Sequence, residues 1–403
     1  MDEGPPQGRL IALDLVRGVA VLGILAVNIA GFAGPMAAVA SPHVPGPGNW
    51  ADEAWFAFAL LVFEGKMRAL FTMLFGASLL LFIGRKDAAG EHGEIVQFRR
   101  LGWLALFGYA HFILLWWGDI LFSYALAGFA ALAFRHLRPQ VLGPAAVALF
   151  LTWHALAGID AWPKVAREQA VLAGTASAQD RAIHAEETRA DAERTEAELA
   201  GYRRSFAEQA AARFAAHPAG PLDTALATMG ETLPLMLLGM ALFRSGFFSG
   251  GWSTRAMLRL ARGGIATGGA LTAAFTGWAW RQHFPPELMI QALVWGLALP
   301  HLLMALGYAA ALVPAAERIA RSPIGARLVA TGRMALSNYI GATLVMTALF
   351  QGWGLGLMST VPPRWYAAFV LGGWAIMLDW SAPWLARFGQ GPLESIWRHL
   401  ARS

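Results

Sequence analysis

Ionisable and amide side chains stand inside long apolar runs of this chain, where burial is costly and each is therefore a candidate for function. A neutral histidine titrates in the range that suits a general base, and an arginine suits a phosphate group. These side chains are, in chain order, Asp14, Arg17, Asn28, Glu64, Lys66, His111, Glu231, His301, Arg333, Asn338 and Asp379.

His111 is the candidate base, because other polar groups are expected at a similar depth in the membrane. At about 1.5 Å per residue, Asn28, Glu64, Lys66, His111 and Asp119 all fall in the outer half of their helices. They could therefore converge on one outer cavity. Two structural alternatives stay open: a hydrogen-bonded core histidine, and a Glu64–Lys66 ion pair that holds the second apolar helix against the first.

Asp14 and Arg17 are spaced i,i+3 near the inner end of the first apolar run, on one helix face. They suit either a salt bridge or an arginine that contacts the phosphate of a cytoplasmic donor. Arg333 lies in the segment GRMALSNYI, whose small and polar residues suit close helix packing. Packing is the expected role of Ser337, whereas for Asn338 packing and function are equally open.

Metal and nucleophile motifs are not evident. The chain has no cysteine, which excludes thiolate sites and disulfides. It also shows no HExxH, phosphate-binding glycine loop or serine elbow. His43 stands in the loop SPHVPGPG, where a solvated histidine is expected rather than one that overhangs the cavity. The sequence therefore predicts no metal centre.

The composition predicts that these residues are carried by membrane-spanning helices. Hydrophobic residues make up 57% of the 403 positions and charged residues only 14%, against about 25% charged in soluble domains. A soluble enzyme is thereby excluded. The net charge of +5 is expected to reflect cytoplasmic loops rather than binding to nucleic acid.

Ten apolar runs are long enough to cross a bilayer, so we expect an all-α, polytopic transmembrane bundle. The second run is interrupted by Glu64-Gly65-Lys66, which predicts a kink. The ten runs are 10–32, 54–84, 98–117, 119–135, 140–158, 224–244, 257–280, 287–312, 330–349 and 364–384.

Arginine and lysine fall almost entirely on one side of this topology. The loops expected outside, 33–53, 118–119 and 350–363, hold almost none. By the positive-inside rule both termini are then cytoplasmic. The C-terminal segment LESIWRHLARS is short and amphipathic, and we expect it at the inner interface.

A polar segment divides the chain into three parts. Residues 159–222 are rich in Ala, Glu and Arg, which predicts one or two extracytoplasmic surface helices. A lid, a partner surface and a simple solvated excursion all remain open for this insertion. It separates an N-terminal five-helix half, 1–158, from a C-terminal transmembrane domain, 223–403.

Several segments resemble the YeiB-like bacterial membrane proteins, which implies a multi-pass protein of the bacterial inner membrane. The similarity covers nearly the whole chain outside the insertion, and the last two segments resemble the C-terminal domain of unknown function 418. The segments are RLIALDLVRGVAVLGILAVN, FEGKMRALFTMLFGASLL, GYAHFILLWWGDILFSYALAG, GRMALSNYIGATLVMTALFQGWGLGL and RFGQGPLESIWRHL.

A more distant similarity concerns chemistry. Arg17, ten further residues and Asn28 resemble a pattern of membrane acyltransferases, including heparan-α-glucosaminide N-acetyltransferase. This implies acyl transfer from cytoplasmic acetyl-CoA or another acyl-CoA to an extracytoplasmic glycan or small molecule. The catalytic histidine of that enzyme type would fall at Val39, so His43 is the nearest candidate by position and His111 the better one by depth.

The resemblance implies two sets of site residues. His111, Asn28 and Glu64 are the expected catalytic groups, and Arg17, Asp14, Lys66 and Arg333 the expected donor-binding groups. A transporter or permease for a small solute is the alternative function, and a structural membrane protein is a third. The expected partners are the lipid bilayer and the acceptor, with stripes of small residues that allow a homodimer.

Overall fold

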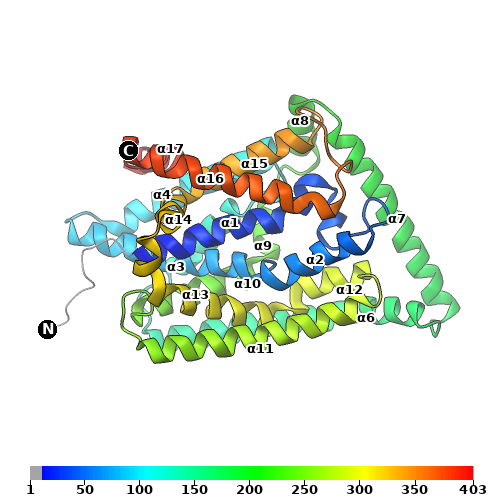
Figure 1. Cartoon of the computed structure of the whole chain (residues 1–403), viewed down its shortest axis with the longest axis horizontal. Coiled ribbons are helices and arrows are strands. Elements are labelled where there is room, and N and C mark those ends of the chain that lie inside the picture. Colours follow the sequence, from blue (N-terminus) through cyan, green and yellow to red (C-terminus); the bar gives the residue numbers. More distant parts are fainter. Residues whose placement is uncertain (1–10, 403) are drawn as a thin grey trace.

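The computed structural model describes residues 11–402, and within them every regular element is a helix. Most helices run along the long axis of the molecule (Figure 1). Helix α1 begins and α17 lies at one end, which we call the arginine end; α7 crosses the opposite end, which we call the α7 end (Figure 1). The elements are α1 Ile11–Ala33, η1 Met36–Val39, α2 Trp50–Val62, α3 Lys66–Ala88, α4 Gly93–Leu114, α5 Leu121–Leu132, α6 Pro139–Leu172, α7 Ala178–Tyr202, α8 Phe206–Ala216, α9 Gly220–Ala227, α10 Met229–Arg244, α11 Thr254–Trp280, α12 Pro286–Gln291, η2 Ala292–Gly296, α13 Ala298–Ala320, α14 Pro323–Arg333, α15 Ala335–Phe350, η3 Pro363–Trp365, α16 Tyr366–Phe388 and α17 Pro392–Arg402.

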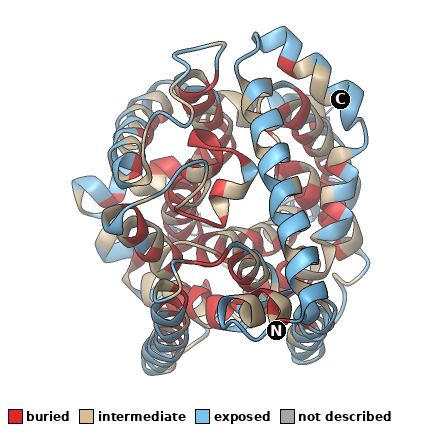
Figure 2. Ribbon diagram, turned by 90° about the vertical axis from the view of Figure 1, so that its right-hand side faces the viewer, coloured by how far each residue is buried: buried red, intermediate tan, exposed pale blue. Residues whose placement is uncertain are grey.

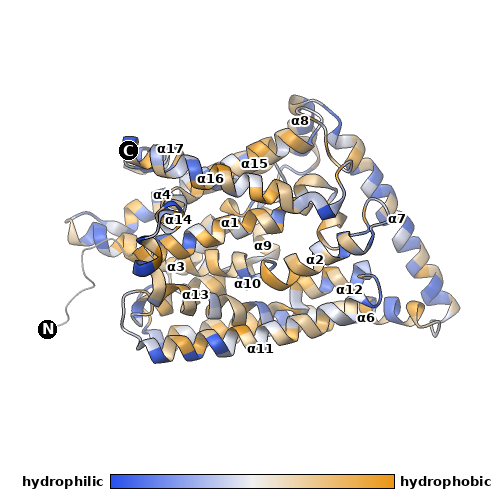
Figure 3. Ribbon diagram, in the orientation of Figure 1, coloured by the Kyte–Doolittle hydropathy of each residue, from blue (hydrophilic) through white to orange (hydrophobic). Residues whose placement is uncertain are grey.

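Four helical stretches in residues 11–402 are long and apolar enough to cross a membrane: α1, α2 with α3, α6 and α13. A fifth is obtained if α9 and α10, which meet at a bend of 64°, count as one span. The prediction of an all-helical, membrane-type chain is confirmed in this form. Hydrophobic residues cover most of the helices, whereas α7 is visibly more polar (Figure 3).

The kink predicted at Glu64-Gly65-Lys66 is a complete helix break between α2 and α3. Gly65 has φ +71°, which residues with a Cβ rarely adopt, and a Cβ there would lie 2.0 Å from His301 Nδ1. The predicted span 287–312 is also interrupted, by the π-helical turn η2 that joins α12 to α13. Irregular backbone inside a bundle is tolerated where protein surrounds it.

Glycines set the close crossing of α1 and α14. A Cβ on Gly18 would lie 2.1 Å from Leu328 O, and one on Gly332 would lie 1.9 Å from Asp14 O. The two backbones therefore touch, as small residues permit in membrane helices. This crossing brings the turn that carries Arg17 next to the turn that carries Arg333. Buried residues gather on the inward faces of the surrounding helices (Figure 2).

The charged insertion is helical, as its composition predicts, but its first part continues an apolar helix. Helix α6 extends to Leu172, beyond the predicted boundary at 159. Helix α7 then crosses the α7 end of the bundle (Figure 1), and all its residues are at least partly exposed. Glu198 of α7 accepts two contacts of 3.0 Å from the backbone N–H of Met36, which ties the insertion to the segment after α1.

Candidate functional site

A cavity of about 650 Å³ opens among α1, α3, α4, α14 and α17 near the arginine end. We call it the arginine cavity, because among the described residues five arginines and two carboxylates line it. These are Arg17, Arg85, Arg100, Arg333, Arg398, Asp14 and Glu394. Its volume is in the range of small-molecule and cofactor sites.

The two carboxylates of the cavity are already engaged, so the positive charge dominates. Asp14 Oδ1 accepts from Arg17 Nη1 at 3.1 Å, and Arg17 Nη2 also donates to Ser78 Oγ at 2.6 Å. Glu394 Oε1 accepts from the backbone N–H of Leu336 and of Ser337, at the start of α15. Glu394 therefore satisfies donors that a helix start leaves open. An anionic ligand would be favoured in such a cavity.

Arg100 is held between two aromatic rings on the cavity wall. Its Cζ lies 4.0 Å from the centroid of the Phe82 ring and 4.1 Å from that of Trp397. The indole Nε1 of Trp397 donates to Arg100 O at 2.8 Å, which fixes α17 against α4. Arg100 Nε is buried without a hydrogen-bond partner among the described residues. The cation is thus fixed in place with donor capacity unused.

One face of α3 gives the cavity its length. Phe71, Phe75, Ser78, Phe82 and Arg85 line it at spacings of four, three, four and three residues. Such spacing keeps the side chains on one helix face, and 14 residues at 1.5 Å each correspond to about 21 Å. The lining therefore changes from charged at the arginine end to apolar and aromatic at depth.

A buried histidine–carboxylate pair lies beyond the deep end. Tyr339 lines the cavity, and its ring centroid lies 5.2 Å from that of His111. His111 Nδ1 lies 3.1 Å from Asp119 Oδ1, at ion-pair distance although the atoms are not aligned as a hydrogen bond. Their side chains are 1% and 2% exposed. On the other side of the ring, Nε2 lies 3.0 Å from Thr343 Oγ1.

This arrangement can hold a proton at a defined atom. Asp119 beside Nδ1 favours a proton on that nitrogen, which leaves Nε2 as the acceptor facing the Thr343 hydroxyl. A carboxylate, an imidazole and a hydroxyl in this order resemble the proton-transfer sets of acyl-transfer enzymes. Tyr339, one helix turn before Thr343, donates its own hydroxyl to Gly118 O at 3.1 Å.

The single outer cavity predicted from depth is not what the structure contains. Asp119 meets His111, but Glu64 and Lys66 belong to a different cluster. Lys66 is 0% exposed, and its Nζ donates to Leu60 O at 2.6 Å rather than pairing with the Glu64 carboxylate. Among the described residues, no hydrogen bond or ion pair joins this cluster to His111. Lys66 therefore does not line the arginine cavity, whereas Arg17, Asp14 and Arg333 do.

Arg68, Glu231 and His301 complete the second cluster. Arg68 Nη2 pairs with Glu231 Oε2 at 3.0 Å, and both side chains line a small void with His301 beside the Gly65 break. His301 Nε2 is buried without a hydrogen-bond partner in the part of the chain that the structure describes. The sequence placed Glu231 and His301 within apolar runs but could not indicate that they meet Arg68.

Asn28 and Asn338 have different surroundings. Asn28 is half-buried on α1, and its side chain makes no hydrogen bond within residues 11–402. Asn338 Nδ2 donates to Thr331 O at 3.1 Å and to Ser381 Oγ at 3.0 Å, so it ties α15 to α14 and α16. Packing is therefore the role of Asn338, as also for Ser337, which binds Glu394.

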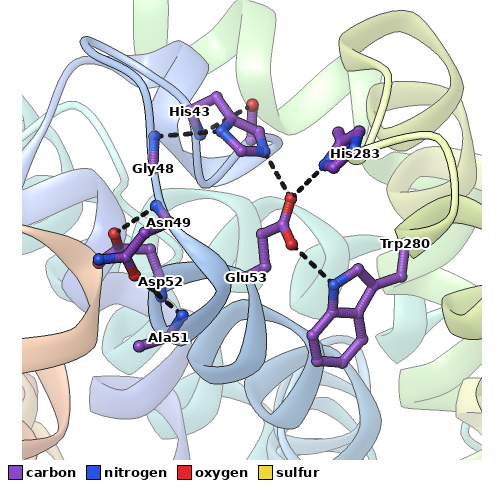
Figure 4. Close-up of polar contacts among 9 residues, drawn as sticks. His43, Gly48, Asn49, Ala51, Asp52, Glu53, Trp280 and His283 are labelled. Atoms are coloured by element: carbon purple, nitrogen blue, oxygen red, sulfur yellow. Dashed lines mark hydrogen bonds and ion pairs between the residues drawn. The ribbon is translucent and has the colours of Figure 1, made fainter.

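His43 is not the solvated loop histidine that its sequence context predicts. Its Nε2 lies 3.0 Å from Glu53 Oε1, and its Nδ1 accepts from the backbone N–H of Gly48 at 3.1 Å (Figure 4). His283 and Trp280 contact the same carboxylate. None of these contacts is apparent from the sequence, because Glu53 lies 10 positions from His43, and Trp280 and His283 lie 227 and 230 positions from Glu53.

Comparison with known proteins finds relatives of this chain. Over 97% of this chain and 96% of the relative, it is 29% identical to the "Uncharacterized protein YeiB" of Escherichia coli strain K12. Residues 242–403 match the family described as "Protein of unknown function (DUF418)". The chain is therefore similar to the YeiB protein over nearly its whole length, and its C-terminal part matches the DUF418 family.

Other YeiB-like relatives extend the match. "Uncharacterized protein YxaH" of Bacillus subtilis strain 168 is 28% identical over 97% of this chain and 93% of that protein. The "Uncharacterized 39.9 kDa protein in amylase 3'region" of Bacillus acidopullulyticus is 34% identical over 35% of this chain and 38% of its own length. No solved structure matches the chain.

Proposed function

We propose that this YeiB-like protein is a membrane acyltransferase, which takes an acyl group from cytoplasmic acyl-CoA, such as acetyl-CoA, and passes it to an extracytoplasmic glycan or small-molecule acceptor. The observation that carries the proposal is the arginine cavity, with the buried His111–Asp119 pair beyond its deep end. Charge at one end and proton-transfer groups at the other match a donor with a phosphorylated head and a reactive tail.

The cavity lining fits the parts of acyl-CoA in order. The phosphates would meet the arginines, which bind such oxygens by charge-assisted hydrogen bonds. The adenine ring would lie near the Arg100–Trp397 stack, where planar groups gather. The pantetheine arm would follow the α3 face from Phe82 to Phe71. Phe71 lies about 21 Å along the helix from Arg85.

His111 would act as the general base of the transfer. Its Nε2 takes the proton of the acceptor hydroxyl or amine as the new bond to the acyl carbon forms. The carbon–sulfur bond breaks, and the CoA thiolate then receives a proton. Asp119 would orient the ring and stabilise its charged form. Asn28, as an amide donor on α1, is proposed to stabilise the developing oxyanion, whereas Glu64 has no role in this step.

The proposed reaction requires a defined topology in the membrane. The arginine end, where α1 begins and α17 lies, would face the cytoplasm of a bacterial inner membrane, with both termini inside and about ten crossings. Arginines at this end, such as Arg85, Arg318 and Arg387, support the orientation by the positive-inside rule. The insertion with α7 would then lie outside.

The first test is donor binding by detergent-purified protein. We expect CoA and acetyl-CoA to bind the wild type, and to bind Arg17→Ala and Arg333→Ala roughly ten- to a hundredfold more weakly, since each loses a charge-assisted contact of about 1.5–3 kcal/mol. Arg259→Ala is the matched control, because Arg259 is exposed on α11 outside the cavity. Calorimetry that finds no binding to folded wild-type protein, or equal binding by all variants, would refute the donor site.

Transport of a small solute is the second candidate, and a separate observation favours it. Glu64, Lys66, Arg68, Glu231 and His301 gather at the break between α2 and α3, and broken helices with buried charges mark transport pathways. Solute uptake into proteoliposomes that is abolished by Glu231→Gln, without covalent change of the solute, would support transport. Loss of a cellular acylated product in His111→Asn cells, with uptake intact, would support transfer.

A further inference from the structure

We propose that His43, Glu53 and His283 bind a divalent metal ion of the zinc class at the α7 end of the bundle. The three residues come from three elements: the loop after η1, the first turn of α2 and the loop after α11 (Figure 4). Their ligand atoms all lie within 4.8 Å of one another. This site is separate from the arginine cavity and does not depend on acyl transfer.

The distances suit a tetrahedral ion after small movements. Glu53 Oε1 lies 3.0 Å from His43 Nε2 and 2.8 Å from His283 Nδ1. Zinc binds nitrogen and oxygen at about 2.0–2.1 Å, so tetrahedral ligand atoms stand roughly 3.3–3.4 Å apart. Each ring nitrogen therefore needs to move away from Oε1 by only about half an ångström, and the two nitrogens, which lie within 4.8 Å of each other, need to reach the same spacing.

The surrounding contacts orient the carboxylate for this purpose. Trp280 Nε1 donates to Glu53 Oε2 at 2.7 Å, which leaves Oε1 turned towards both histidines (Figure 4). Glu53 stands in the first turn of α2, and that turn is fixed by a capping box between Asn49 and Asp52. Partners of this kind set the orientation of a ligand and are typical of metal sites.

The backbone beside His283 is held in an uncommon conformation. His283 and Phe284 have φ values of +57° and +55°, each at a cost of about 1–3 kcal/mol for residues with a Cβ. Phe284 is fully buried and packs against Phe56, with ring centroids 5.0 Å apart. The buried ring thus anchors the loop, and the loop presents His283 Nδ1 to Glu53.

Two histidines and a glutamate are the ligand set of catalytic zinc sites with an open fourth position. His283 has a side chain 77% exposed, so that position would face solvent. An ion there would polarise water or a hydroxyl-bearing ligand that approaches the α7 end. Cysteine-bound structural zinc is excluded, since the chain has no cysteine.

The proton on the His43 ring must change position before the ion can bind. The Gly48 N–H is donated to His43 Nδ1, so in the ion-free state Nε2 carries the proton and donates it to Glu53. Ligation through Nε2 requires the neutral ring to carry that proton on Nδ1 instead, so the Gly48 peptide, whose N–H faces Nδ1, must turn away. Gly48 follows the exposed stretch Pro45–Pro47, so the loop has room to do so. Binding is thus coupled to a change of tautomer at His43 and to a local movement of this loop.

The test is metal binding by full-length protein purified without a polyhistidine tag and stripped with a chelator. Titration with Zn²⁺ is expected to give one tight site per chain, and Co²⁺ in its place is expected to give the visible absorption of a tetrahedral complex. In Glu53→Gln and in His283→Ala the affinity is expected to fall on the order of a hundredfold. His283→Ala removes an exposed side chain, so its folding is not at risk, and a thermal melt verifies this.

His136→Ala is the matched control, because His136 is an exposed histidine outside the cluster. It is expected to bind Zn²⁺ as the wild type does. Equal Zn²⁺ binding by the wild type, Glu53→Gln and His283→Ala would overturn the proposal, as would absence of binding to the folded wild type. In either case Glu53 is simply a carboxylate that accepts three hydrogen bonds.

Discussion

His111 illustrates how little of a residue's chemistry lies in the residue itself. In the proposed reaction the ring acts as a directed base only because Asp119 lies 3.1 Å from Nδ1 and leaves Nε2 for a hydroxyl. The same holds for Arg100, a surface-type cation that two aromatic rings fix on a cavity wall. A single substitution at such a position is therefore expected to change either the rate of acyl transfer or the affinity for CoA, but not both.

We expect Asp119→Asn to lower the rate of acyl transfer by about 10²- to 10⁴-fold, the contribution typical of an oriented base. The amide is similar in size but cannot stabilise the charged imidazole. CoA affinity is expected to stay within a factor of about three, since Asp119 does not line the arginine cavity. Transfer rates and calorimetry on the same preparation measure both quantities. A joint loss of binding and transfer would indicate misfolding instead.

The candidate polar residues could be identified from the sequence, but most of the side chains that they contact could not. The spacing of Asp14 and Arg17 predicted their contact, because three residues is a local distance on a helix. His43 was misjudged because its partner His283 is 240 positions away and only the folded chain brings them to one carboxylate. Glu64 and Lys66 were expected beside His111, but the structure places them near Arg68 and Glu231 instead.

Helix α14 helps to set the position of Arg17, although Arg17 belongs to α1. Its Gly332 lies against the backbone of α1, and Gly18 of α1 lies against Leu328 of α14. Side chains between the two helices would separate them and move Arg17 away from Arg333. Hydropathy predicted that a helix runs through 330–349, but not that a break at Met334 turns α14 against α1.

Gly18→Ala is expected to destabilise the protein by about 1–3 kcal/mol, because the added Cβ would lie 2.1 Å from Leu328 O. The melting temperature and the CoA affinity should fall together. Gly84→Ala on α3 is the control: nothing lies within 4 Å of its Cβ position, and alanine is the better helix former. An unchanged melting temperature for Gly18→Ala would show that α1 and α14 can separate at no cost.

At the scale of the whole molecule, the two ends differ in chemistry. The arginine cavity opens near one end, and the His43–Glu53–His283 cluster and α7 lie at the other (Figure 1, Figure 4). Composition predicted a membrane protein because charge is scarce and segregated. It could not show that helices such as α6 extend beyond the apolar region or that α7 crosses the bundle end.

The absence of cysteine makes the orientation directly testable. We expect a single cysteine at Ala192→Cys in α7 to react with a membrane-impermeant maleimide added to intact spheroplasts. Ser249→Cys, in the exposed turn between α10 and α11, is expected to react only after lysis. Both positions are exposed, so a difference in labelling reports the side of the membrane. Reversed labelling would place the arginine cavity outside and exclude a cytoplasmic donor.

Helix α17 also has a consequence for genetics. Its 11 residues include the Glu394 that caps α15 and the Trp397 and Arg398 that line the cavity. A stop codon after position 391 would leave all the long helices encoded and still remove part of the site. Such late truncations should therefore behave as null alleles, and reporter fusions joined to the C-terminus should be compared with an untagged gene before any phenotype is assigned.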